Sequence, residues 1–429
     1  MTEIFKIAII FFVLVVFFIG PLNIFDKTNK ELRINILNYN FIINFNILLF
    51  LSLISLPIKN YQLIYITILL LTFFYTLLVS KISYFHLIKK NIINFSIFYF
   101  SFFIIAINIS SNLNFGWDAK YFYYIKSLFF FEGLGLNELR EFEHNKWHPH
   151  FGSYLWAFFW SLPFMEIEYF GRLSYVFIFC FSIYFITKIP NNNYHSVLLY
   201  LVILILLFKY DRFSGLQEIL IFSYLSIASK ILYDLENKKK ILDLIMLILI
   251  TNLIMWIKAE GIVYSLIILT IFLFNNKVIV KEKVFIFLIF MIFVSLKYNV
   301  YLLYDLELNA QPYNFESFFS LSIENLYYRF EKILIYLGYY SLINPIFLIG
   351  VILTILLNFL NNDKILTKNF NIYFILNTLF IFSAYLLRDL EIVYSLKTTL
   401  ERIVFTSSGF YVYLIIIFIN KKFKKWKIS

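Results

Sequence analysis

Cysteine is nearly absent from this 429-residue chain, and the single one, Cys180, excludes any intramolecular disulfide. Charged residues are also scarce, at 15% of the chain, whereas a soluble domain carries about 25%. Glycine occurs only 11 times, which limits the close helix packing that small residues allow in membranes. These shortages exclude a disulfide-stabilised scaffold and leave no room for a sizeable soluble domain.

Apolar residues make up 61% of the chain, and the mean hydropathy is +0.80. Apolar runs of about 20 residues, the length that crosses a bilayer as a helix, recur along the sequence. We expect about 13 spans, at residues 4–22, 41–57, 61–80, 92–110, 169–187, 194–209, 215–233, 241–257, 261–275, 283–304, 333–357, 370–387 and 402–420. The predicted fold class is therefore all-α, a polytopic transmembrane helical bundle with residues 1–429 in a single membrane domain. The first run lacks a small-residue cleavage site, so we interpret it as an uncleaved helix.

The net charge of +11 fits the orientation rule for membrane proteins better than nucleic-acid binding, which we do not expect. Lysines crowd the C-terminal tail at 421–427, and Lys and Arg collect in cytoplasmic segments. With that tail inside, counting backwards places two long loops outside, at 111–150 and 305–332. The piece 151–165 is short for a span and contains Trp156, Trp160 and Pro163, which predicts an interfacial or re-entrant helix. We expect an integral protein of the inner or plasma membrane whose functional face lies outside the cytoplasm.

Chargeable residues that are far apart in the sequence gather on this predicted outer face. Lys258 breaks the sidedness rule there, and an ionisable residue that does so at a membrane boundary is a functional candidate. The candidate site residues are Trp117, Asp118, Lys146, His148, Gln217, Glu218, Lys258, Glu260 and Arg402. Acids, cations and aromatics in one place predict a site for a polar substrate.

Six short motifs follow one another along these segments: Trp117-Asp118-Ala119 with aromatics after it, His148-Pro149-His150, Gly171-Arg172-Leu173, Ser214-Gly215-Leu216-Gln217-Glu218, Lys258-Ala259-Glu260-Gly261 and Glu401-Arg402. Their order and shared sidedness resemble the GT-C superfamily of integral-membrane glycosyltransferases, more narrowly the dolichyl-phosphate-mannose mannosyltransferase and aminoarabinose transferase group. The likeness covers residues 111–265 and then depends on Arg402. Glu218 stands where many relatives have Asp, and His148 where many have Lys. Four predicted spans precede the acidic loop, which is more than that group usually has.

The resemblance implies a sugar donor carried on a polyprenyl phosphate, and a lipid, glycan or protein acceptor. In an inverting transfer the acceptor hydroxyl attacks the anomeric carbon while lipid phosphate leaves, and a carboxylate that takes the hydroxyl proton contributes roughly 10²- to 10⁴-fold. Asp118 is the predicted catalytic carboxylate, with Glu218 as a second catalytic candidate. Arg402 offers a planar fork suited to phosphate, and Lys258 a point charge. Membrane lipid and the apolar spans would surround the isoprenoid tail, and we expect no resident cofactor.

Each charged candidate also has a plainer interpretation, which the sequence leaves open. Asp118 is placed to cap the helix that follows it, and Glu218 to favour a helix dipole. Lys258 with Glu260 would make an interfacial ion pair that contributes little to stability. Arg402 would be a side chain that snorkels at a helix end.

The histidines of the first outer loop include a His-x-His pair, His148 and His150, with His144 nearby. No further ligand spacing supports a metal site, so we assign no metal ligand, although a requirement for a divalent ion stays open. Charged residues between the last two spans are interpreted as a solvated loop: Arg388, Asp389, Glu391 and Lys397.

The sequence thus predicts a hexosyl- or pentosyltransferase that uses a lipid-phosphate sugar donor. The leading alternative is a transporter or flippase of lipid-linked sugars, which about 13 spans would suit. Transporters, however, usually show internal repeats and broken helices near the midplane, whereas here no repeat is visible and the chargeable residues gather at one face. A third alternative is an O-antigen polymerase or ligase, which would need an Arg-rich outer loop that neither long loop provides.

Overall fold

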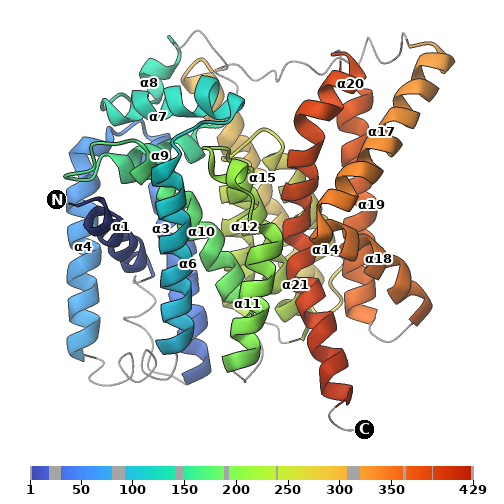
Figure 1. The fold of residues 1–429 in the computed structure, drawn as a ribbon, viewed down its shortest axis with the longest axis horizontal. Helices are drawn as coiled ribbons and strands as arrows, with labels where there is room; N and C mark the ends of the chain where they lie inside the picture. Colours follow the sequence, from blue (N-terminus) through green and yellow to red (C-terminus); the bar gives the residue numbers. More distant parts are fainter. Residues whose placement is uncertain are drawn as a thin grey trace.

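A computed structural model describes residues 2–18, 30–79, 92–141, 148–187, 193–237, 240–306, 319, 321–360, 364–388 and 390–426. Within these residues every regular element is a helix and there is no β-strand, as the sequence predicts (Figure 1). The elements are α1 (Glu3–Val16), α3 (Lys30–Leu53), α4 (Ile58–Val79), α6 (Ile92–Ser111), η1 (Ala119–Tyr123), α7 (Tyr124–Phe131), α8 (Leu136–Leu139), α9 (Phe151–Trp160), α10 (Tyr169–Thr187), α11 (Asn193–Leu207), η2 (Tyr210–Phe213), α12 (Glu218–Asn237), α13 (Ile241–Met255), α14 (Gly261–Leu273), α15 (Val280–Leu303), α17 (Ile323–Ile343), α18 (Pro345–Leu360), α19 (Lys364–Leu386), α20 (Ile392–Ser395), η3 (Leu396–Leu400) and α21 (Glu401–Trp426).

Several of these helices suit a membrane. In the described part of the chain, five are long and apolar enough to cross a bilayer, or up to six if one bent pair counts as a span. Other apolar helices are shorter, such as α13 with 15 residues and α14 with 13. At 1.5 Å per residue these are well short of a hydrocarbon core of about 30 Å. The structure is therefore that of a helical membrane protein, and the full count of 13 spans is not established by it.

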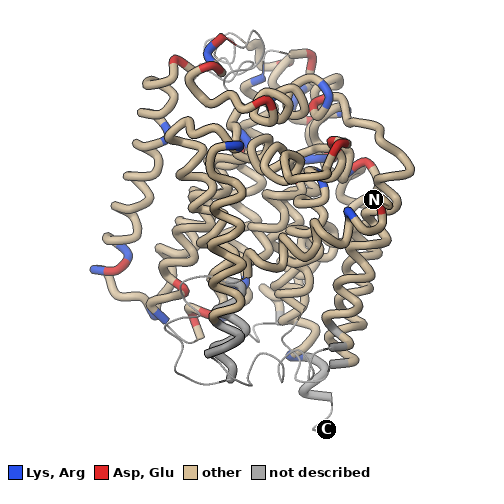
Figure 2. Tube along the Cα trace, turned by 90° about the vertical axis from the view of Figure 1, so that its left-hand side faces the viewer, with Lys and Arg blue, Asp and Glu red and all other residues tan. Residues whose placement is uncertain are grey.

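Charged residues concentrate toward the two ends of the bundle, and few lie in the band between them (Figure 2). Helix α15 exposes apolar side chains, among them Phe285, Met291 and Ile292. Exposed apolar surface of this extent is what lipid contact requires.

The chain bends by 110° between α17 and α18, within the span predicted at 333–357, so this stretch is not one straight helix. The side-chain oxygen of Asn344 accepts a hydrogen bond from the backbone N–H of Phe347 at 3.1 Å, and Pro345 is the first residue of α18. A capping Asn followed by Pro at the first helical position is a helix start, so a new helix begins in a new direction. The predicted short helix within 151–165 is α9, whose 10 residues are too few to cross.

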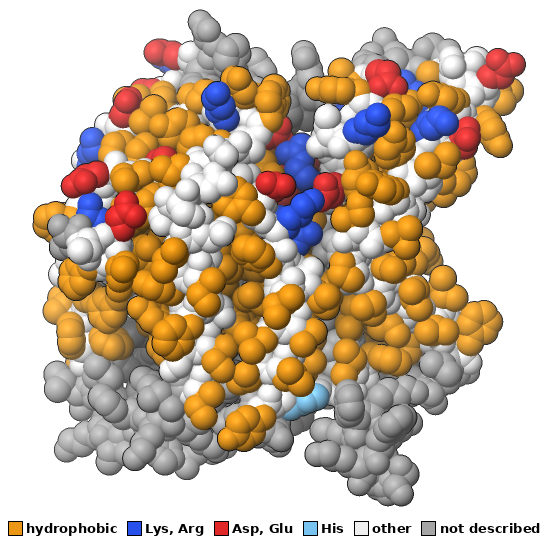
Figure 3. Space-filling view, in the orientation of Figure 1, with side chains coloured by type: hydrophobic (Ala, Val, Ile, Leu, Met, Phe, Trp, Pro, Cys, Tyr) orange, Lys and Arg blue, Asp and Glu red, His pale blue; other side chains and the backbone are white. Residues whose placement is uncertain are grey.

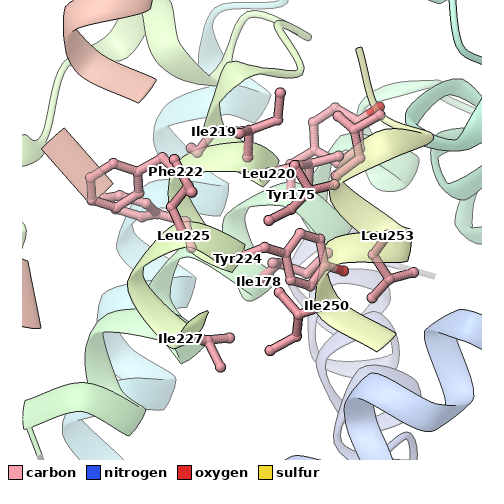
Figure 4. Packing of buried hydrophobic residues seen from close by; sticks show 14 of the residues in the cluster. Tyr175, Ile178, Ile219, Leu220, Phe222, Tyr224, Leu225, Ile227, Ile250 and Leu253 are labelled. Carbon is pink, nitrogen blue, oxygen red and sulfur yellow. The ribbon is translucent and has the colours of Figure 1, made fainter. Parts of the chain in front are cut away.

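The core that supports the site lies between α10, α12 and α13 (Figure 4). Apolar side chains from these three helices, among them Ile178, Leu220, Tyr224 and Leu253, are buried against one another. Their contiguous burial fixes the position of α12, which carries Glu218 at its first residue.

Helix α21 runs against α12 at very close range. The Ser226 hydroxyl on α12 donates to the carbonyl of Gly409 on α21 at 2.8 Å. A Cβ on Gly409 would lie 2.3 Å from the carbonyl oxygen of Phe222, so only glycine allows this approach. The close packing brings the first turn of α21, with Arg402, beside the first turn of α12.

Candidate functional site

Five of the predicted site residues form one continuous network of ion pairs. The guanidinium of Arg402 contacts the carboxylates of both Asp118 and Glu218, the second at 3.3 Å. The Lys258 ammonium lies 2.9 Å from the same Glu218 oxygen and 3.7 Å from a Glu260 oxygen. The side chains of Glu218 and Lys258 are only 7% and 8% exposed, so water screens this part of the network weakly.

The network lines a cavity of about 930 Å³. Its walls come from the start of η1, from α12, α14, α19 and α21, and from the turn that contains Lys258. Away from the network the lining is mainly apolar and includes Ile221, Val263, Phe380 and Ile403. Figure 3 shows acidic and basic side chains close together in the upper centre of one face, above a broad apolar surface. A charged group attached to an apolar chain matches such a lining.

Backbone contacts bring the first loop to the start of α12. The N–H of Gly116 donates to the carbonyl of Ser214 at 3.0 Å. Between Ser214 and Glu218 the chain turns at Gly215, whose φ of +90° is a conformation that favours glycine. Asp118 and Glu218 are thus held near one another by the turn that the sequence shows as Ser-Gly-x-x-Glu.

Arg172, buried in the first turn of α10, fixes the same two segments. Its guanidinium makes a two-pronged ion pair with Glu168, at 3.0 and 2.7 Å. One of its nitrogens also donates to the carbonyls of Phe213 and Asn114, at 3.3 and 3.5 Å. Arg172 therefore positions the loop that carries Asp118 and does not itself line the cavity.

The carboxylate of Asp118 does not cap the helix that follows it, because its side chain makes no capping hydrogen bond and Asp118 is itself in a helical conformation. The Asp118 carboxylate instead pairs with Arg402. Glu218 does occupy the first turn of its helix, and its second oxygen is buried and has no hydrogen-bond partner among the described residues. The plainer interpretation is thus excluded for the capping role of Asp118, whereas a dipole role for Glu218 remains compatible with its ion pairs.

Lys258 stays charged in this environment. Burial alone would lower the pKa of Lys258, but the charges of Glu218 and Glu260 outweigh burial and hold that pKa well above its usual range. The pair with Glu260 is therefore one part of a buried network and not an isolated surface contact.

Trp117 and His148 also line the cavity. Trp117 is 67% exposed, with its ring against Phe122, and the His148 ring stacks on Phe122 with 5.3 Å between centroids. Burial, followed by the positive charges of Lys126, Lys258 and Arg402, keeps the pKa of His148 well below its ordinary value. The imidazole of His148 is therefore neutral at physiological pH and adds no charge to the cavity.

One predicted substrate contact that the structure describes, Gln217, does not line the cavity. Gln217 is fully buried outside the cavity lining, where its amide is best oriented to donate to the carbonyl of Ile257 at 2.5 Å and to accept from Ser153 at 3.1 Å. Gln217 therefore joins the start of α12 to α9 and to the turn before Lys258. Lys146 lies outside the described residues, as does His144.

Arg388 is a cavity residue that the sequence interpretation missed. Its guanidinium donates to the Thr399 hydroxyl at 3.0 Å, and its Nε is buried without a hydrogen-bond partner among the described residues. A sequence signal existed, because Arg388 follows an apolar run on the same predicted face as Arg402. Its charged neighbours made the segment resemble an ordinary solvated loop.

Within the described residues no group of three or more His, Cys, Asp and Glu is arranged to hold a metal ion. The chain matches no protein-family model, no curated protein and no solved structure. The resemblance of its motifs to GT-C glycosyltransferases therefore stays a prediction from the sequence.

Proposed function

We propose that the protein is a glycosyltransferase of GT-C type that moves a sugar from a polyprenyl-phosphate donor to a lipid, glycan or protein acceptor. One observation carries the proposal. Asp118, Glu218, Lys258 and Arg402 come from four distant segments, yet they meet in one network at a cavity whose remaining lining is mainly apolar. Charge at an otherwise apolar cavity suits a phosphate head with a hydrocarbon tail.

In the proposed reaction the acceptor oxygen forms a bond to the anomeric carbon of the sugar. The bond between that carbon and the phosphate oxygen breaks, and its electron pair leaves with the lipid phosphate. The acceptor proton passes to Asp118, which is partly exposed and therefore reachable from the cavity. Glu218 is placed to hold Lys258 and Arg402 in position for the leaving phosphate.

The cations supply the second part of the proposed mechanism. Negative charge grows on the leaving phosphate, and preorganised donors in a weakly screened site stabilise such charge more than water does. Arg402 has a buried Nε without a hydrogen-bond partner among the described residues, so it retains a donor for substrate. In the free enzyme Asp118 occupies another nitrogen of the same guanidinium, and an incoming phosphate would displace it. That exchange would release Asp118 to act as a base.

The proposal includes a side and a span count. We place the cavity at the outer face of the inner or plasma membrane, with about 13 spans in total. This placement is supported by the lysine-rich tail, since the C-terminus lies at the end of the bundle away from α7, α8 and α20 (Figure 1).

The test uses the purified full-length chain with radiolabelled lipid-linked sugars extracted from the source cells. We expect Asp118→Asn to lower label transfer out of the lipid fraction by about 100-fold or more. Glu141→Gln is the matched control, because Glu141 is an exposed acid of the same loop outside the cavity lining, and it should transfer at the normal rate. Full transfer by Asp118→Asn, or no transfer by the unaltered protein with any extracted donor, contradicts the proposal.

A transporter or flippase of lipid-linked sugars is the alternative that one observation favours, since the 110° bend between α17 and α18 is the kind of helix break that transporters use. The residues at that break, Asn344 and Pro345, do not line the cavity. A flippase would move the donor across the vesicle membrane without releasing its sugar, and Asp118→Asn would not change the rate of that movement.

A further inference from the structure

Arg388 differs from the other two cations of the cavity in its partners. Lys258 and Arg402 each contact two carboxylates. Among the described residues, no carboxylate lies within ion-pair distance of Arg388, and its guanidinium instead contacts the Thr399 hydroxyl and the ring of Tyr385. Its positive charge is thus unbalanced by any neighbouring acid in the described structure.

Arg388 does not serve to bind the free carbonyls at the C-terminal end of α19 either. A cation at a helix C-terminus commonly binds the last free carbonyls. At the end of α19 those carbonyls are taken by Arg329 of α17, which donates to the carbonyls of Leu386 and of Arg388 itself, at 3.3 and 2.7 Å. The guanidinium of Arg388 is left to face the cavity.

Arg388 and Arg402 both line the cavity, and Arg388 contacts the segment that leads into Arg402. Thr399, which accepts from Arg388, precedes Arg402 by three residues, and residues at that spacing are neighbours on one helix face. The Tyr385 hydroxyl lies 2.7 Å from the Thr399 hydroxyl, so this side of the cavity holds Arg388 in place.

We infer that Arg388 is a second phosphoryl-binding group, and that the donor is a lipid diphosphate rather than a lipid monophosphate. This inference rests on the proposed function. The phosphoryl group that bears the sugar lies at Arg402 beside Asp118, and the phosphoryl group that bears the lipid lies at Arg388. The tail then follows the apolar part of the lining, which includes Phe380 and Ala384 of α19. When the sugar–oxygen bond breaks, the electron pair leaves with the lipid diphosphate and the acceptor proton goes to Asp118.

The charges of the cavity support this assignment. Three carboxylates and three cations line it within the described residues, and the carboxylates contact only Lys258 and Arg402. A single phosphoryl group at Arg402 would leave half-buried Arg388 without an anionic partner among the described residues. A second phosphoryl group satisfies it through charge-assisted hydrogen bonds, which are about twice as strong as neutral ones.

The experiment compares farnesyl phosphate with farnesyl diphosphate as ligands of the full-length protein in detergent, with a chelator present. Unaltered protein should bind the diphosphate about tenfold more tightly or better. Arg388→Gln should abolish that preference and change monophosphate affinity by less than about twofold. Arg388→Lys keeps a point charge without the planar fork, so it should keep only part of the preference. The matched control is Lys397→Gln, because Lys397 is an exposed cation of the same segment outside the cavity lining.

The outcomes separate this inference from the proposed function. Equal affinity of the unaltered protein for both ligands overturns the diphosphate assignment. The assignment is also overturned if Arg388→Gln, shown to be folded by its thermal unfolding transition, binds both ligands more weakly by the same factor. If the two affinities are equal but Arg402→Gln weakens both, the proposed function stands without the second phosphoryl site. If the unaltered protein binds neither ligand, the proposed function fails together with the inference.

Discussion

Arg402 donates a hydrogen bond to the carboxylate of Asp118, although 284 residues separate the two in the sequence. The contact joins the first turn of α21 to the loop before η1, and Glu218 shares the same guanidinium. The position of Asp118 therefore depends on three separate segments of the chain. A change at any of them should alter the electrostatics of the cavity.

The buried pair between Glu218 and Lys258 should be strongly coupled. Removing one member of a buried pair leaves an uncompensated charge and typically costs about 3–5 kcal/mol. We expect Glu218→Gln and Lys258→Met each to lower the thermal unfolding temperature clearly, and the double variant to recover a large part of the loss. Thermal unfolding of all four proteins in one detergent gives the coupling energy. Additive losses in the double variant would show that the pair is not coupled.

Much of this site could be predicted from the sequence. Counting apolar runs predicts one shared face for five residues, and the structure joins all five in one network: Asp118, Glu218, Lys258, Glu260 and Arg402. Counting spans gives only the end of the bundle on which a residue lies. Contact among them requires the tight α12–α21 packing, which depends on one glycine that no motif identifies.

The errors have equally local causes. Gln217 is next to Glu218 in the sequence, so the predicted topology places both on the substrate side of the membrane. In the structure, however, α9 covers Gln217, and Gly152 of that helix packs against its amide. The span predicted at 333–357 averages hydropathy across Asn344 and Pro345, and so it does not reveal the bend between α17 and α18. The sequence does not reveal Arg388 because its access to the cavity depends on which side chain binds the carbonyls at the end of α19. In the folded protein Arg329 binds them, and this contact depends on tertiary structure.

The close packing at Gly409 gives a prediction about stability and position. In Gly409→Ala the new Cβ would meet the Phe222 carbonyl at 2.3 Å, and a backbone oxygen cannot move aside cheaply. Overpacking of this kind costs about 1–3 kcal/mol, and it should push α21 away from α12 and lower transfer activity. Thermal unfolding and the transfer assay measure the two effects.

Gly338→Ala is the matched control for that variant. Gly338 lies within α17, and a Cβ there would meet nothing within 4 Å. Replacing glycine by alanine inside a helix should stabilise the protein by about 0.5–1 kcal/mol without changing activity. If Gly409→Ala behaves like Gly338→Ala, the α12–α21 approach is looser than described.

Lys126 gives the stability a dependence on pH. Burial lowers the pKa of Lys126 to about 7, whereas in the unfolded chain it is about 10.4. Between these values the unfolded chain holds a proton that the folded protein has lost, so stability should rise with pH across this window. The unfolding temperature measured from pH 7 to 10 should therefore climb less steeply in Lys126→Met than in the unaltered protein.

The same variant should be more stable than the unaltered protein at pH 7. Its advantage should shrink toward pH 10, where neutral Lys126 keeps its hydrogen bond to the His148 carbonyl. Lys120→Met, at an exposed lysine nearby, should leave the pH profile as it is. A profile for Lys126→Met that is parallel to the unaltered one would mean that Lys126 titrates normally.

The most direct test of the central claim is the affinity of Asp118→Asn for farnesyl phosphate. If Asp118 and a substrate phosphate compete for Arg402, removing the Asp118 charge should tighten binding about fivefold, because a partly exposed ion pair of this kind is worth up to roughly 1 kcal/mol. The tightening should disappear when Arg402→Gln is also present. Unchanged or weaker binding by a folded Asp118→Asn variant would contradict the claim that the two residues share one phosphate site.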